Sequence, residues 1–221
     1  ASTDGVAAAA VPSQGLTGRL RDFMPSLDVT FNAAVMPFAQ PGSTNAAIAI
    51  VAGMAEPVVF GITRVVQRMD IRVLAYDERG TTVIDVTRRA EINVPPSAEN
   101  YVRYDVLNQI ALPPGHYNFR LVAHNADTDK LGAIEFGITV PDFGHDAISL
   151  SGVAISVASA EPMVTIGSLA TILPVAPTAV RKFLNGDRVT AFARVYQGGD
   201  APPSDATLDV RILDARGEEV Y

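Results

Sequence analysis

The chain has 221 residues, 48% hydrophobic and 19% charged, and its 17 Lys and Arg against 24 Asp and Glu leave a net charge of −7. This composition excludes an intrinsically disordered chain, and the negative charge argues against a protein that follows a nucleic-acid backbone. Because cysteine is absent, disulfides, thiol catalysis and cysteine zinc sites are excluded, and no apolar run approaches the roughly 18 residues that cross a bilayer.

Residues 1–26 are predicted to be a linker, because Ser, Gly and Pro punctuate them and no apolar face alternates. From Leu27 the apolar period becomes two, which is typical of half-buried β-strands. The run 46–52 is apolar throughout and favours a buried strand. The strands predicted in this first unit are 27–35, 46–52, 69–76, 81–86, 91–94, 101–111, 116–124 and 132–140, with a hairpin turn at 77–80.

The segment 141–144, Pro-Asp-Phe-Gly, is predicted to close this unit and to mark a domain boundary. The strands predicted beyond it are 147–157, 163–172, 188–196 and 208–213. The third of these has the clearest alternation, with Val189, Ala191, Ala193 and Val195 on one face. No convincing amphipathic helix interrupts the series, so the fold class is all-β.

An internal repeat supports two units of one topology. Asp70-Ile71-Arg72-Val73-Leu74, followed by Arg79-Gly80, recurs as Asp209-Val210-Arg211-Ile212-Leu213, followed by Arg216-Gly217. We therefore expect two tandem immunoglobulin- or fibronectin-III-like β-sandwiches, over 27–142 and 146–221. Since the second hairpin would end at the last residues of the sequence, we expect this second sandwich to be truncated. It would then be docked on the first, or completed by strand addition from another chain, with self-association as one outcome.

The stretch Leu112-Pro113-Pro114-Gly115-His116-Tyr117-Asn118-Phe119-Arg120 resembles the L-P-P-G-x-Y-x-x-R element of immunoglobulin-like units in large secreted bacterial proteins. With the polar turn 127–132 and the segment 138–143, it is similar to the region downstream of the adhesive domain in bacterial secreted von Willebrand factor A-related proteins. Residues 181–183 and 189–196 are similar to the module that follows there. The resemblance implies a secreted, periplasmic or cell-surface location in a larger protein. No Asp-x-Ser-x-Ser adhesion motif is present, so the adhesive activity does not carry over.

The Pro-Gly-x-Tyr element also has a physical explanation. A Tyr just after a tight turn folds its hydroxyl back onto upstream backbone while its ring closes the end of the sandwich, as in a tyrosine corner. Tyr117, with Gly115 and Pro114, is therefore predicted to be a structural corner rather than a ligand site. Arg120 is interpreted as a surface residue, or as the partner of Asp105 or Asp142.

The search for catalytic residues predicts none. The three histidines are His116, His124 and His145, and no Gly-x-Ser-x-Gly elbow is present. The first two share one strand face but would lie about 26 Å apart, too far to share a metal. His145, with its neighbours Asp146, Ser149 and Ser151, is interpreted as interdomain linker because strand neighbours point to alternate faces.

Asp127 and Asp129 are weak calcium candidates, because two Asp spaced by one can direct carboxylates at one ion. A solvated hairpin turn explains them more simply, and no metal or cofactor is predicted. The leading hypothesis is a non-enzymatic extracytoplasmic structural or protein-interaction module. The alternative is an accessory substrate- or glycan-binding module of a secreted hydrolase, which the absence of Trp weakens. A third hypothesis is an enzyme that shares its site with a missing domain.

Overall fold

The computed structural model describes residues 30–57, 65–94, 101–158, 163–165, 172–183, 185–200, 202, 204–213 and 216–219. The predicted linker and the start of the first predicted strand lie outside these residues. All regular secondary structure in the described residues is β. The strands are β1 (Thr30–Ala39), β2 (Ala46–Pro57), β3 (Val65–Tyr76), β4 (Thr82–Val94), β5 (Tyr101–Leu112), β6 (Gly115–Asn125), β7 (Lys130–Val140), β8 (Ser149–Leu150), β9 (Ala154–Val157), β10 (Met163–Thr165), β11 (Val189–Phe192) and β12 (Val195–Tyr196).

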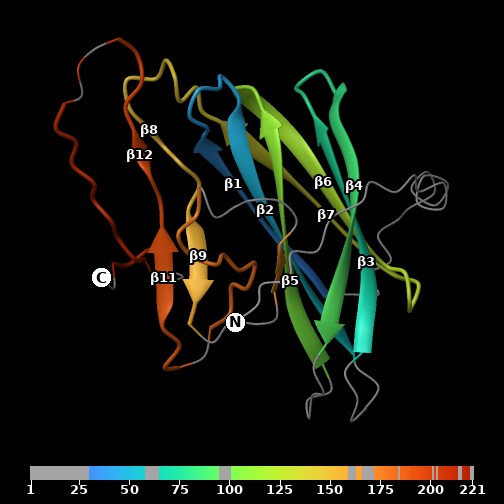
Figure 1. Cartoon of the computed structure of the whole chain (residues 1–221). Helices are drawn as coiled ribbons and strands as arrows, with labels where there is room; N and C mark the ends of the chain where they lie inside the picture. Colours follow the sequence, from blue (N-terminus) through green and yellow to red (C-terminus); the bar gives the residue numbers. More distant parts are fainter. Residues whose placement is uncertain are drawn as a thin grey trace.

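Two four-stranded sheets face each other as the layers of a β-sandwich (Figure 1). Sheet A has the order β1-β2-β5-β10 and sheet B the order β4-β3-β6-β7. The first seven strands pair antiparallel, with the order of an immunoglobulin- or fibronectin-III-like sandwich. The predicted all-β sandwich is therefore confirmed. Among the described residues, no helix has the length and apolar character needed to span a membrane.

Alternation along each strand builds the core between the sheets. On β3, the side chains of Met69, Ile71, Val73 and Ala75 are fully buried, as the period of two requires for one face of a sheet. The other members of this core cluster come from the remaining six of the first seven strands; the largest are Phe31, Ile48, Ile50, Met54, Ile92, Tyr104, Leu112, Tyr117, Phe119 and Leu121. Phe119 stacks on Phe136 of the neighbouring strand with ring centroids 6.0 Å apart.

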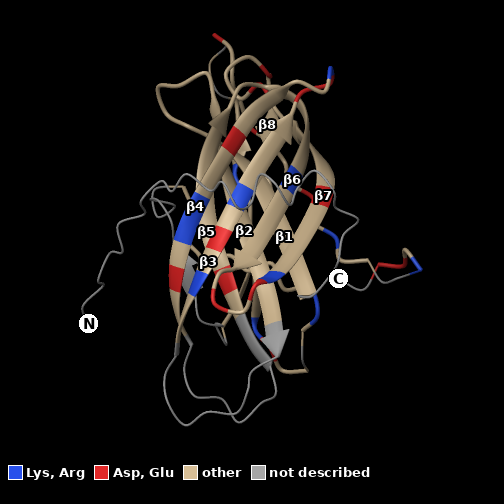
Figure 2. Cartoon of the chain, turned by 90° about the vertical axis from the view of Figure 1, so that its right-hand side faces the viewer, with Lys and Arg blue, Asp and Glu red and all other residues tan. Residues whose placement is uncertain are grey.

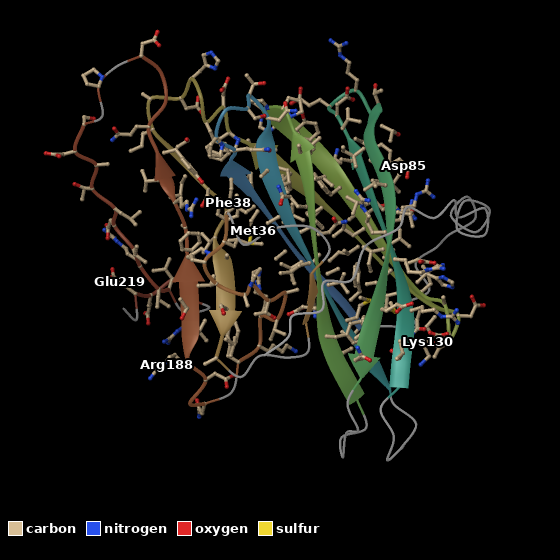
Figure 3. The ribbon with its side chains drawn as sticks, viewed as in Figure 1. Met36, Phe38, Asp85, Lys130, Arg188 and Glu219 are labelled. Atoms are coloured by element: carbon tan, nitrogen blue, oxygen red, sulfur yellow. The ribbon has the colours of Figure 1, made fainter. Side chains whose placement is uncertain are left out.

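Strand β2 is apolar at consecutive positions because sheet A is covered on both faces. Ile48 and Ile50 point into the sandwich core, whereas Ala47, Ala49 and Val51 belong to a second cluster on the outer face. Ala154, Ile172, Leu173 and Ala179, all from the second half of the chain, complete this outer cluster. Met36 and Phe38 lie between β1 and the strands β9 and β11 (Figure 3), and Phe38 stacks on Phe192 at 6.3 Å.

The strands that cover sheet A form two short antiparallel pairs, β9 with β11 and β8 with β12. Two glycines permit the close approach of this second half. A Cβ on Gly152 would lie 2.6 Å from Cα and Cβ of Met36, and a Cβ on Gly53 would lie 2.7 Å from Oδ1 of Asp105 and 2.8 Å from Cβ of Ala179. The second half therefore packs directly on the first, and β10 joins β5 in parallel.

Four predicted elements differ from the structure. The strand predicted at 147–157 is divided into β8 and β9, which belong to separate two-stranded sheets. β4 is one continuous strand to Val94, whereas 81–86 and 91–94 were predicted as separate strands. The strand predicted at 188–196 is interrupted between Phe192 and Val195, and Phe192 rather than Val189 packs inward. Residues 208–213 were predicted as a strand, but the only pairing they show within the described part of the chain is the isolated bridge between Leu213 and Glu219. That residues 146–221 represent a second sandwich stays a prediction.

Candidate functional site

The Pro-Gly-x-Tyr element lies at the turn between β5 and β6. The Tyr117 hydroxyl donates to the carbonyl oxygen of Pro113 at 3.0 Å, and the ring is buried. Gly115 has φ +150, in a region where a side chain is strained, and Pro114 is partly buried. This is the geometry of a tyrosine corner. Burial raises the pKa of the Tyr117 phenol, and the nearby Asp77 charge adds to that.

Asp127 and Asp129 are directed to different partners. Asp127 accepts hydrogen bonds from the Arg68 backbone amide at 2.7 Å and from the Arg68 guanidinium. These hydrogen bonds lower the pKa of the Asp127 carboxyl. Asp129, with φ 54, lies 2.9 Å from Nε2 of His124. In the described part of the chain, no group of three His, Cys, Asp or Glu side chains is placed to hold a metal ion.

The remaining polar residues singled out from the sequence each contact a different partner. Arg120 pairs with Glu135 across β6 and β7 at 3.3 Å, so its expected alternatives Asp105 and Asp142 are not its partners. Nδ1 of His116 lies 2.9 Å from the Thr139 hydroxyl. Nδ1 of His145 lies 2.9 Å from Asp142, and this contact raises the pKa of the exposed imidazole.

The outer face of sheet B carries ion pairs between neighbouring strands. Figure 2 shows blue and red bands alternating over β3, β4, β6 and β7. Arg89 binds Asp70 through two hydrogen bonds of 2.7 and 2.8 Å, and Arg72 binds Asp85 at 2.8 and 2.7 Å. Because opposite charges neutralise each other across neighbouring strands, we interpret this face as a solvated surface.

A cavity of about 440 Å³ opens on the outer face of sheet A where the second half crosses it. It is lined by Thr30, Asn32, Gly53, Met54, Ala55, Tyr104, Asp105, Val180, Arg181 and Lys182. Burial raises the pKa of Asp105, and hydrogen bonds from Thr178 and from the Ala179 amide act in the opposite direction. The carboxyl group therefore holds the 178–180 segment on the sheet, and sequence reasoning had treated it only as a possible partner of Arg120.

The second half also exposes most of the large apolar side chains on the surface. All but two of those that are exposed in the described residues come from it. We call this set the apolar flank: Ile148, Leu150, Val153, Phe183, Val189, Val195, Leu208, Val210, Ile212 and Leu213. Leu150 and Val195 are direct cross-strand neighbours and are 44% and 42% exposed. Exposed apolar surface of this kind marks interaction sites in soluble proteins.

Sequence reasoning anticipated unpaired strands in this region but not which side chains they expose. The alternation in 188–196 was visible, yet which face packs inward depends on the partner surface. That surface is the outer face of sheet A, where the ring of Phe192 stacks on the ring of Phe38. The uninterrupted apolar run of β2 indicated that both faces of its sheet are covered, since apolar and polar residues alternate in a strand that is covered on one face only.

No protein-family model matches the chain, and no curated protein matches its sequence. Among solved structures, a beta-glucuronidase of Bacteroides uniformis is similar with a TM-score of 0.35 and 11% identity, over 54% of this chain and 13% of that enzyme. A Bordetella pertussis protein described as ApaA is similar with a TM-score of 0.33 and 13% identity, over 52% of this chain and 94% of that protein. The chain thus covers a small part of the glucuronidase. The assignment of the sandwich rests on the strand order given above.

Proposed function

We propose that the chain is a non-enzymatic, extracytoplasmic protein-interaction module of a larger secreted or surface protein, and that the apolar flank is its contact surface. The observation that supports this proposal is the concentration of exposed apolar side chains on the second half. Burying such side chains against another surface is favourable, and exposed apolar side chains that lie together mark interaction sites. The extracytoplasmic location rests on the resemblance of the 112–120 stretch to secreted bacterial proteins.

The contacts of the three histidines support a non-enzymatic role. Nucleophilic catalysis needs a base within hydrogen-bond reach of a nucleophile and an orienting group behind that base. Nδ1 of His116 contacts the Thr139 hydroxyl, across neighbouring strands. The contacts of His124 and His145 are the carboxylates of Asp129 and Asp142, in pairs on the surface.

The alternative function is an accessory module that binds glycan or another substrate polymer, and the cavity beside Asp105 is the feature that favours it. Asn32, Asp105 and Lys182 supply polar groups there. The one aromatic residue in the lining, Tyr104, is 2% exposed and belongs to the sandwich core. Its ring face is therefore closed to a sugar, and the apolar flank remains the better-supported contact surface.

Site-specific photo-cross-linking in the parent protein, expressed in its own cell, tests the proposal. One cross-linker replaces Val195 on the flank and a matched one replaces Val83 on β4, since both side chains are 42% exposed. We expect protein cross-links from position 195 and not from position 83, and their loss when the neighbouring Leu150 is changed to Asp. Equal cross-linking from both positions would contradict the proposal. Retardation in a polysaccharide affinity gel that Lys182→Ala abolishes would support the alternative.

A further inference from the structure

Among the described residues, 204–213 belong to no β-ladder, and Leu213 at their end forms an isolated antiparallel bridge with Glu219. The Gln197 side chain fixes their start, since it accepts from the Ser204 amide at 2.8 Å and donates to the Ser204 carbonyl. From there the segment runs along the outside of β12 and β11 (Figure 1). In the described structure no ladder includes residues 204–212. Leu208, Val210 and Ile212, which share one face in an extended chain, are 60%, 63% and 53% exposed.

The equivalent strand of the first unit shows what this sequence pattern does when neighbours are present. In β3, Ile71 and Val73 are fully buried, and the alternating Asp70 and Arg72 bind Arg89 and Asp85 on the adjacent strand β4. In the repeat, Arg211 binds Asp209 two residues away on its own strand at 2.7 Å. The two charged residues of β3 therefore pair with residues of a neighbouring strand, whereas the two charged residues of the repeat pair with each other.

We propose that the neighbour of this strand is a second copy of the same chain, paired antiparallel about Val210. The proposal deepens the proposed function, on which it rests, by naming the partner of one part of the apolar flank. In this register Val210 faces its own symmetry mate, Leu208 faces Ile212 of the second copy, and Asp209 faces Arg211 of the second copy. The three apolar residues then share one face, and two opposite-charge pairs form on the other.

Charge fixes this register against its neighbours. A slip by two residues that centres the pair on Asp209 or on Arg211 places like charges directly opposite each other, which is destabilising. A slip by one residue opposes charged and apolar side chains. Parallel pairing in register also places Asp209 beside its own copy. Of these arrangements, only the antiparallel one centred on Val210 places apolar side chains opposite each other on one face and opposite charges opposite each other on the other face.

The pairing fits the surrounding structure and closes on itself. It needs only residues 208–212 and leaves the bridge between Leu213 and Glu219 in place. Because the same strand is used by both copies about a two-fold axis, the contact is isologous and yields a dimer rather than a fibre. The short ladder predicts a concentration-dependent association, driven by the apolar side chains that both copies place on one face.

Charge-reversal variants, measured by sedimentation velocity over a concentration series, test the register. Asp209→Arg and Arg211→Asp each place like charges opposite each other, so each should weaken self-association by roughly tenfold or more. In an equimolar mixture of the two variants, each cross-strand pair between unlike copies again joins one basic and one acidic side chain. The mixture should therefore associate as the native chain does, and so should the double variant. Asp205→Arg, a charge reversal outside the paired residues, is the matched control.

Thermal unfolding of each variant shows that the fold is retained, since both side chains are more than half exposed. A native chain that stays monomeric, single variants that associate like the native chain, or a mixture that fails to associate would each overturn the proposal. These results leave the proposed function standing if position 195 still cross-links to another protein. Loss of the cross-links with an intact charge-dependent dimer would instead overturn the proposed function.

Discussion

The backbone amide of Ala179 donates to Oδ1 of Asp105 at 3.4 Å, across 74 residues of sequence. This contact joins the second half of the chain to the middle of sheet A, at the point where Gly53 leaves no room for a side chain. A buried carboxyl group at such a junction makes the stability of the docked arrangement depend on pH.

We predict opposite pH dependences for Asp105→Asn and Asp85→Asn. Burial raises the pKa of Asp105 above the ordinary value of 3.8, so the folded state binds its proton more tightly than the unfolded state does. The free energy of unfolding therefore falls as pH rises from that value to the raised one. Asp105→Asn removes this loss, and its stability relative to the native chain should increase with pH over this window.

Asp85 is the matched control with the reverse sign. The hydrogen-bonded Arg72 lowers the pKa of Asp85 below 3.8, so its contribution is present above that value and is lost as pH falls below it. Asp85→Asn should therefore lose stability relative to the native chain as pH rises toward 3.8. Thermal melts at a series of pH values measure both differences. Parallel curves for the native chain and Asp105→Asn would show that Asp105 is not buried as described.

Two tyrosines test the corner by the same substitution. Tyr117→Phe removes the hydrogen bond to Pro113 and should lower the free energy of unfolding by about 1 kcal/mol, whereas Tyr117→Ala should cost about 3–5 kcal/mol. In the described structure the buried hydroxyl of Tyr196 has no hydrogen-bond partner, so Tyr196→Phe should be neutral or stabilising. Denaturant unfolding compares the three variants. An equal loss for both Phe variants would mean that the hydroxyl of Tyr117 stabilises nothing.

Gly53→Ala should separate the second half from sheet A without unfolding the sandwich. The added Cβ would meet Asp105 at 2.7 Å and Ala179 at 2.8 Å, and overpacking of this kind costs about 1–3 kcal/mol. Hydrogen exchange should then increase in β9 and β11, while β6 and β7 stay protected. Gly80→Ala, in the β3–β4 turn where a Cβ meets nothing within 4 Å, has strain at φ +76 but should leave β9 and β11 unchanged.

Calcium should not stabilise the fold, because Asp127 binds Arg68 and Asp129 binds His124. We expect the same melting temperature with a chelator and with added calcium. Asp129→Asn should not create a difference between these conditions. A melting temperature that drops by several degrees with chelator, and no longer does so in Asp129→Asn, would show that the two carboxylates hold an ion.

Local patterns in the sequence predicted the sandwich, because alternation in β3 and at 116–124 sets which side chains face a core. They did not predict β4 correctly, since Arg88 and Arg89 interrupt the apolar pattern in its middle. Arg89 is outward and binds Asp70, while Arg88 is opposite the buried Ile71 in the ladder. A charged residue at an inward-facing position is typical of edge strands, and β4 is an edge strand of sheet B.

The repeat predicted a strand at 208–213 with a turn and a return strand, and in the described residues the bridge between Leu213 and Glu219 is the one pairing of that hairpin. Alternation is a property of one segment, whereas a ladder needs a second strand at the right distance. In β3 that second strand is present on both sides. The contact of Asp105 with the second half could not be predicted from the sequence either, because its partner segment at 178–180 is 74 residues away and has no strand pattern of its own.

Hydrogen exchange at two protein concentrations tests the central claim, that the second half docks on sheet A and exposes the segment 205–213 for contact with protein. In dilute solution we predict strong protection for 116–140, protection for 154–157 and 189–192, and fast exchange for 205–213. At high concentration, residues 208–212 should become protected while the other segments are unchanged. Slow exchange of 205–213 in dilute solution, equal to that of 116–140, would contradict the account.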